Sequence, residues 1–267
     1  MSVAGSPSPE VTRLALRNGF GRLERTFLPR KEVNVKEENR RLFMAAAVSA
    51  IAILATGGVL LWIFVSWALA LFPLWVAVLA IGALFNSPNF RKKLGSHRLY
   101  LFEEGLLLDT GAGRLFAVRW DQAVHYQETV QEVINYKGTK TPFKSAHTST
   151  LVAPDGTSVQ ISDFFADYGT WVPLIAEAIA RAQAQRVWEA VRDGQKAAYG
   201  PFELDAGGIA DKRRGTLPWS AVEAIDVREG LVVVREHGQV RAWAQAQVKT
   251  VPNLLVFLTV ASNLQGG

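Results

Sequence analysis

The sequence contains no cysteine. A chain without thiols forms no disulfide and holds no zinc through cysteine, and it has neither a thiol nucleophile nor a cysteine that can carry a lipid. The absence is also consistent with a reducing compartment. Thiol enzymes, zinc-cysteine modules and disulfide scaffolds are therefore excluded at the outset.

Charge is absent from residues 42–85. One helix needs about 20 apolar residues to cross a bilayer, and this run has roughly twice that length. Basic residues flank it at 40–41 and 91–93. We therefore expect a transmembrane helical hairpin, with helices at about 42–62 and 68–85 within a segment ending at residue 86. The alternative is a helical hairpin buried in a protein core.

The positive flanks predict where the hairpin and the termini lie. By the positive-inside rule both ends of the hairpin face the cytoplasm, which predicts a multi-pass cell-membrane protein with cytoplasmic N- and C-termini. The formal charge of +5 and the isoelectric point near 9.6 raise nucleic-acid binding as a possibility. Because the basic residues gather beside the apolar run, we expect the lipid bilayer and its anionic headgroups as partners and no nucleic acid.

The pattern of apolar residues divides the rest of the chain. Residues 1–41 read as an N-terminal cytoplasmic arm that is partly disordered. Residues 96–194 alternate with the period of strands and then end in a helix at about 170–192, because Trp171, Ile175 and Ile179 recur on one helical face. Residues 199–263 repeat that order more briefly, with a helix at about 252–263. The predicted fold class is therefore α+β, with the helical hairpin followed by two β units that each end in a helix.

The two β units echo each other in sequence. Each has a strand, an acidic residue before a glycine, a hairpin and a tryptophan at a strand end; these tryptophans are Trp120 and Trp219. This order resembles the pleckstrin-homology-like (PH-like) superfold, a small sheet or barrel closed by a C-terminal helix. One departure from this pattern is that the second unit is short for a complete PH-like barrel, so it is either a reduced copy or a unit that packs against the first.

The layout also resembles a family of uncharacterised bacterial two-pass membrane proteins with tandem PH-like cytoplasmic domains. The motifs that carry this resemblance are a Leu-x-Gly-Phe/Leu-Gly stretch at residues 16–21, Leu-Pro-Trp at 217–219 and Val-Pro-Asn at 251–253. That family assigns no catalytic residue, so the resemblance transfers none.

The sharpest catalytic motif is Asp109-Thr110-Gly111. It resembles the active loop of retroviral-type aspartic proteases, which need two carboxylates sharing one proton. The chain has no second copy of the motif, so this chemistry requires a homodimer. The alternative is an ordinary hairpin turn, which the return to a strand after Gly113 favours.

The remaining motifs predict no catalytic, cofactor or metal site. The four histidines have no partner at metal-ligand spacing, and the glycines match no phosphate loop. Two basic loops are candidates for contact with anionic headgroups or a partner, because lysine and arginine bind phosphate by charge and hydrogen bonds. Their residues are Lys137, Lys140, Lys144, Lys212, Arg213 and Arg214. The alternative is a pair of ordinary solvated loops.

These features predict a non-catalytic, membrane-anchored interaction or scaffold module that presents PH-like domains at the cytoplasmic face. One alternative is a sensor or transport-accessory subunit that packs on another membrane protein. Another is a dimeric aspartic peptidase that uses Asp109. A homodimer is compatible with each of these hypotheses, and a free edge of a β sheet offers a further site for a partner peptide by strand addition.

Overall fold

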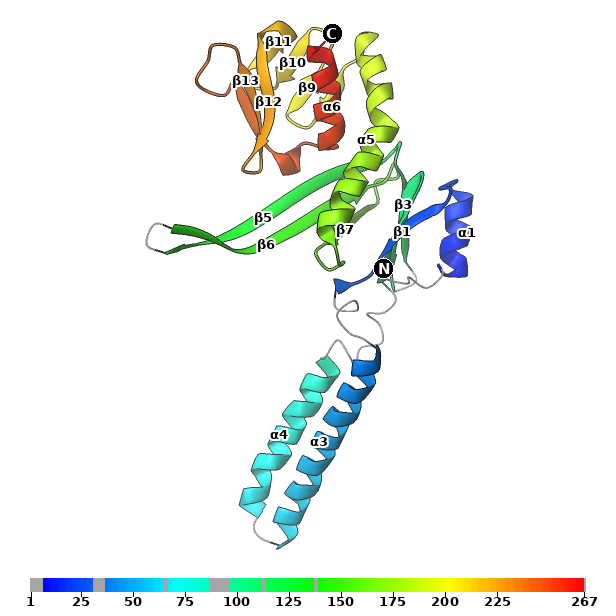
Figure 1. Cartoon of the computed structure of the whole chain (residues 1–267), viewed down its shortest axis with the longest axis vertical. Coiled ribbons are helices and arrows are strands. Elements are labelled where there is room, and N and C mark those ends of the chain that lie inside the picture. Colours follow the sequence, from blue (N-terminus) through cyan, green and yellow to red (C-terminus); the bar gives the residue numbers. More distant parts are fainter. Residues whose placement is uncertain are drawn as a thin grey trace. The chain divides into compact units, whose positions relative to one another are not determined.

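The computed structural model describes residues 7–30, 37–64, 67–86, 97–111, 114–136 and 139–266 (Figure 1). The chain consists of two compact units. One comprises residues 1–27, 99–108 and 115–267 and carries the β structure; the other comprises residues 28–98 and 109–114 and carries the helical hairpin. The fold class is α+β, with most elements in sheets.

The first β unit consists of a four-stranded sheet, a three-stranded sheet and a helix. The four-stranded sheet has the order β1-β2-β3-β4, and the three-stranded sheet has the order β5-β6-β7. Their bounds are β1 Leu23–Phe27, β2 His97–Phe102, β3 Gly105–Thr110, β4 Leu115–Arg119, β5 Val124–Tyr136, β6 Thr139–Val152 and β7 Ser158–Ser162. Helix α5 (Tyr168–Arg192) follows and ends at Gly194, whose positive φ of 90° suits glycine.

The second β unit repeats this order. Its sheets run β11-β10-β9-β8 and β12-β13-β14. The bounds are β8 Ala197–Tyr199, β9 Phe202–Leu204, β10 Gly208–Asp211, β11 Gly215–Pro218, η2 Trp219–Ala221, β12 Val222–Arg228, β13 Leu231–Glu236, β14 Ala244–Gln247, η3 Val248–Thr250 and α6 Leu254–Gln265. The second unit thus has as many strands as the first, although the sequence suggests a reduced copy.

Matching contacts show that the two β units are copies of one motif. The indole Nε1 of Trp120 donates to the carbonyl oxygen of Phe102, and that of Trp219 donates to Asp205, each at 3.0 Å. The side chains of Gln183 and Gln265 donate to the carbonyl oxygen three residues after each tryptophan. In both copies, the tryptophan therefore fixes the end of a hairpin, and the glutamine attaches the C-terminal helix to the segment that follows the tryptophan.

The repeat also contains a glycine that no other residue can replace without a shift. A Cβ on Gly105 would lie 2.8 Å from the carbonyl oxygen of Val118, and one on Gly208 would collide with that of Leu217. Each carbonyl belongs to the residue two positions before the repeat's tryptophan. Gly105 of the first unit therefore corresponds to Gly208 of the second. This correspondence differs by one residue from the alignment that the repeated sequence pattern suggests.

The helical hairpin is inserted into the first β unit. Phe27 at the end of β1 pairs with Leu99 in β2, so residues 28–98 leave and re-enter the sheet at one place. The hairpin consists of α3 (Glu37–Phe64) and α4 (Trp67–Asn86), which pack against each other. A Cβ on Gly58 would lie 2.8 Å from the Leu74 side chain, so this glycine permits the close approach of the two helices.

The expected membrane crossing is corrected by the structure. Among the helices of the described residues, none combines the length and the apolar character that crossing a bilayer requires. The charge-free run does form two helices, but α3 begins in charged residues, and its middle contains Ser49, Thr56 and Gly57. A count of missing charges overlooks these small and polar residues. The two-pass hairpin is therefore wrong, as are the cell-membrane location and the cytoplasmic placement of the termini that depend on it.

One hydrophobic core runs through both β units. It joins Leu99 and Leu151 of the first unit to Phe202 and Val234 of the second. Helices α5 and α6 lie side by side and contribute the largest helical side chains, including Trp171 and Phe257, which are fully buried. Because the core is shared, the two β units are one structural body.

The N-terminal segment docks on the outer face of the first sheet. Helix α1 (Pro9–Arg17) is capped by Ser8, and strand β1 pairs antiparallel with β2. Phe20 is 1% exposed and belongs to a second core cluster with Tyr100, Phe102 and Leu107. The structure therefore shows that this segment covers the face of the sheet opposite the main core.

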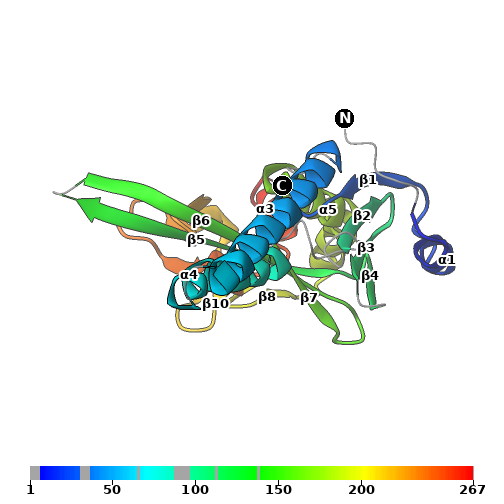
Figure 2. The same cartoon turned by 90° about the horizontal axis from the view of Figure 1, so that it is seen from below.

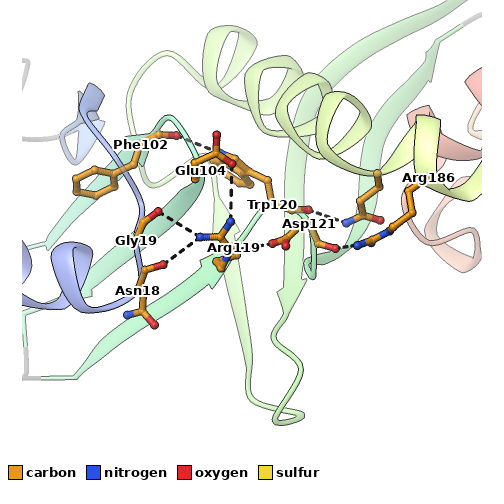
Figure 3. Close-up of polar contacts among 9 residues, drawn as sticks. Asn18, Gly19, Phe102, Glu104, Arg119, Trp120, Asp121 and Arg186 are labelled. Carbon is orange, nitrogen blue, oxygen red and sulfur yellow. Dashed lines mark hydrogen bonds and ion pairs between the residues drawn. The ribbon is translucent and has the colours of Figure 1, made fainter.

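Arg119 fastens this segment to the sheet (Figure 3). Its Nη1 donates to the carbonyl oxygens of Asn18 and Gly19 at 3.1 and 3.2 Å, and its Nε lies 3.1 Å from the Asp121 carboxylate. The Glu103 carboxylate accepts the backbone N–H of Arg22. The stretch at residues 16–21 is therefore a docking motif.

We expect Phe20→Ala to lower the free energy of unfolding by about 3 kcal/mol, because the ring leaves a cavity between α1 and the sheet. Urea denaturation followed by tryptophan fluorescence measures this change. Leu16→Ala is the matched control, since Leu16 is 76% exposed on the same segment. Equal stabilities of the two variants would show that the segment does not dock.

Candidate binding groove at the junction of the β units

Asn253 joins the second β unit to the edge of the first. Its backbone N–H donates to the carbonyl oxygen of His125 at 2.8 Å, and its side-chain Oδ1 accepts the backbone N–H of His125 at 2.7 Å. Asn253 thus engages both main-chain groups of one residue of β5, as a neighbouring strand does. Its left-handed backbone (φ 48°) is one that asparagine tolerates well.

The Asn253 amide also reaches the closing glutamine of the first unit. Its Nδ2 donates to the Ala123 carbonyl at 3.0 Å and to Gln183 Oε1 at 2.9 Å. Gln183, which is buried, in turn donates to the carbonyl oxygens of Trp120 and Ala123. These contacts satisfy the buried amide of Gln183 and the half-buried amide of Asn253, and they give the junction one arrangement.

His125 lies beneath this contact and is 2% exposed. Its Nε2 lies 3.2 Å from Ser149 Oγ, and its Nδ1 lies 3.5 Å from Gln127 Nε2. Burial lowers the pKa of His125 to about 4, because desolvation penalises the charged imidazolium. Since an amide nitrogen only donates, Nδ1 is the acceptor and Nε2 donates to Ser149. This buried pair is therefore structural, and His125 is not oriented to act as a base toward the hydroxyl.

The pairing of His125 shows how the edge of β5 is oriented. In an extended strand, residues two apart direct their main-chain groups to the same side. The N–H and C=O of Gln127 therefore point to the same outer edge that Asn253 occupies at His125. Within the described sheets, β5 is the end strand of its order. Asn253 covers the first position of this edge, and η3, which precedes it in the chain, also packs against β5.

A groove lies beside the edge of β5, next to the position that Asn253 covers. An apolar cavity of about 270 Å³ lies between α5 and α6, with Val172 and Leu258 on its walls. A polar cavity of about 460 Å³ lies between β5, the β12–β13 turn and η3. Gln127 and Leu254 line both cavities. The two cavities therefore adjoin each other at Gln127 and Leu254, and together they are called the groove.

An ion pair closes the polar end of the groove. Lys249 Nζ of η3 lies 2.9 Å from Glu128 Oε1 of β5, so it links the two β units. Both side chains are 40% or more exposed, and such pairs contribute little to stability. Asn253 therefore holds the junction, and the ion pair sets the charge beside the groove.

Beyond the groove, β5 and β6 continue as a two-stranded ribbon, which Figures 1 and 2 show extending away from the sheets. β7 pairs with β6 only from Thr148 to Val152. The sequence suggests a loop at residues 138–145, but β6 begins at Thr139. The edge of β5 therefore runs from the groove far out along this ribbon.

The structure places the predicted basic residues on separate sheets. Lys140 and Lys144 lie on β6, where they pair with Asn135 and Glu132 in the register. Lys137 lies outside the described residues. Lys212, Arg213 and Arg214 form the exposed β10–β11 turn, in which Asp211 Oδ1 accepts the backbone N–H groups of Arg213 and Arg214. Other residues line the two cavities described above, so binding of anions by these six residues stays a prediction.

Asp109 takes the part of a turn residue. Its Oδ1 accepts the backbone N–H of Gly111 at 2.7 Å, and Thr110 Oγ1 donates to the carbonyl oxygen of Arg114 at 3.0 Å. Both contacts tie the β3–β4 turn to itself, as Asx turns do. The described geometry therefore explains the motif through local structure alone.

The sequence carries one signal for the groove, the Val-Pro-Asn motif at residues 251–253. Pro252 precedes the turn into α6, and asparagine is, after glycine, among the residues that best tolerate the left-handed conformation that follows. The partners of Asn253 on β5 and α5 are distant in sequence, so only the fold reveals them.

We expect stability to fall as the pH drops from about 6.5 to about 4. In this window His125 is protonated in the unfolded chain and neutral in the folded chain. The free energy of unfolding therefore decreases by up to about 3 kcal/mol as the pH falls. The measurement is urea denaturation between pH 4 and 7.5. His125→Gln should flatten this part of the pH dependence relative to the parent, whereas the exposed His237→Gln should leave it unchanged. The same slope in His125→Gln would refute this assignment.

Comparison with known proteins now adds a classification. No curated protein and no solved structure matches the chain. One family model matches residues 13–266, nearly the whole chain and both β units with the inserted hairpin. The match includes Asn253, His125 and the residues that line the groove. The chain therefore belongs to DUF6585, a family of unknown function.

Proposed function

We propose that this protein is a non-catalytic interaction module, in which the two β units form a scaffold and the groove between them binds an extended segment of a partner protein. The observation that carries the proposal is the contact of Asn253 with both main-chain groups of His125. Asn253 occupies one position on the edge of β5. The next residue of β5 whose main-chain groups face outward is Gln127, which lines the groove. A partner segment would continue the pairing that Asn253 begins.

The shape of the groove supports an extended partner. Strand addition needs a free edge and neighbouring pockets that receive alternate side chains. The edge of β5 has one cavity toward the α5 and α6 helices and a second toward η3, with Gln127 between them. A strand laid on this edge would direct one row of side chains into each.

The rigid junction also supports binding. Asn253, Gln183 and the shared core hold α6 and α5 at a defined separation, so the walls of the groove exist before a partner arrives. Such preorganisation lowers the entropic cost of association. The twice-repeated order of four strands, three strands and a helix supports the PH-like resemblance as part of this proposal.

The proposal keeps the scaffold function that the sequence suggests and drops the membrane anchor. The inserted hairpin is then a second, separate element of the scaffold. The sensor-subunit and peptidase hypotheses stay predictions, because no described contact favours either one.

A library of random twelve-residue peptides, displayed on phage and selected on the full chain, tests the proposal. We expect selected peptides to bind the parent, and Ala176→Trp to weaken them by more than about tenfold, because the indole fills the apolar cavity that Ala176 lines. Replacing alternate backbone N–H groups of a selected peptide by N-methyl groups should abolish binding, since strand addition uses them.

Gln185→Trp is the matched control, because Gln185 is exposed on the same helix outside the groove. This variant should bind as the parent does. Urea denaturation of both variants shows that each is folded. A library without any binder, or peptides that bind Ala176→Trp as tightly as the parent, would contradict the proposal.

A further inference from the structure

The carboxylates beside the groove outnumber the cations. The polar cavity is lined by Glu128, Glu229 and Lys249, and the apolar cavity is lined by Glu177. Lys249 is engaged with Glu128. In the described part of the chain, no hydrogen bond or ion pair joins Glu177 or Glu229 to a cation. Two carboxylates therefore stand unneutralised, one at each cavity.

These two carboxylates are placed for contact with a ligand in the groove. Glu177 is exposed on α5, one position after Ala176 on the cavity wall, and Glu229 is exposed in the β12–β13 turn. Exposed like charges around a concave site produce a field that attracts the opposite charge and disfavours their own.

The alternation of side chains along the edge of β5 further restricts the sequence of a segment that binds there. Gln127 lines both cavities, whereas Glu128, on the opposite face of the strand, lines only the polar one. Side chains of an added strand alternate in the same way. One row would therefore meet the apolar walls of α5 and α6, and the other would meet Glu229 and the Glu128–Lys249 ion pair.

We propose that the segment bound in this groove is basic and alternating, with apolar side chains at every second position and lysine or arginine between them. This inference rests on the proposed function and names the chemistry of its partner. The apolar row occupies the cavity of Val172, Leu254 and Leu258, and the cationic row faces Glu229. Glu177 contacts a basic residue at the rim of the apolar cavity.

Charge also argues against a second copy of this chain as the occupant. The β5 edge of another copy carries Glu128 and would bring a like charge to the acidic rim. Such a contact costs binding energy that a basic segment gains. Sedimentation of the full chain at several concentrations provides the check, and a dimer that Ala176→Trp dissociates would overturn the basic-segment assignment.

Three peptides of equal length test the proposal. Each alternates valine with a second residue, which is lysine in the first, threonine in the second and glutamate in the third, and each is carried by a flexible linker on the same fluorescent protein. Binding to the full chain is measured by anisotropy. We expect the lysine peptide to bind more than about tenfold tighter than the glutamate peptide, with threonine between them. The difference should shrink as the salt concentration rises, because exposed charges are screened.

Charge reversal identifies the residues responsible. Glu177→Lys combined with Glu229→Lys should make the glutamate peptide the tighter ligand, and Glu189→Lys, on an exposed position of α5 outside the groove, should keep the parent preference. Equal affinities for the three peptides, or an unchanged preference in the double variant, would overturn the proposal.

The two proposals fail in different ways. If library-selected peptides bind in the groove while the lysine peptide binds no tighter than the glutamate peptide, the basic segment is wrong and the interaction module stands. If Ala176→Trp affects no peptide of any kind, the groove is not a binding site and both proposals fail.

Discussion

The two-way contact between Asn253 and the main chain of His125 is the interaction on which the molecule depends. One side chain and one backbone amide stand in for a neighbouring strand, so a β sheet of the first unit ends against the helix that closes the second. The shared core could bring the two units together without it, but hydrophobic contact is not directional. Asn253 fixes the orientation of the two β units relative to each other, and thereby the position of the groove.

The same contact explains why a histidine without partners at metal-ligand spacing is buried. His125 is neutral in the folded chain because its ring lies between Ser149 and Gln127 in a desolvated site. A neutral imidazole supplies one donor and one acceptor, which matches the hydroxyl and the amide beside it. The residue thus serves the junction through both its backbone and its ring.

Sequence reasoning reached the parts of the fold that local patterns encode. The apolar face of Trp171, Ile175 and Ile179 indicates a helix that α5 contains, and the two tryptophans of the echo occupy matching places. It failed where the physics is not local. The β1 strand has no strong alternation, and it pairs with β2 only across the inserted hairpin. The missing charges of residues 42–85 show two apolar helices but not what surrounds them. The groove eluded prediction because its parts come from β5, α5 and α6.

The insertion of the hairpin has a consequence for the order in which the chain assembles. β1 is synthesised early, yet β2, its neighbour in the described sheet, begins only at His97, after the inserted hairpin. Closing so long a loop costs entropy before any pairing is gained. In the second unit, β8 meets β9 across a tight turn. We therefore expect the later half of the chain to nucleate faster and the N-terminal strand to be among the last elements to pair.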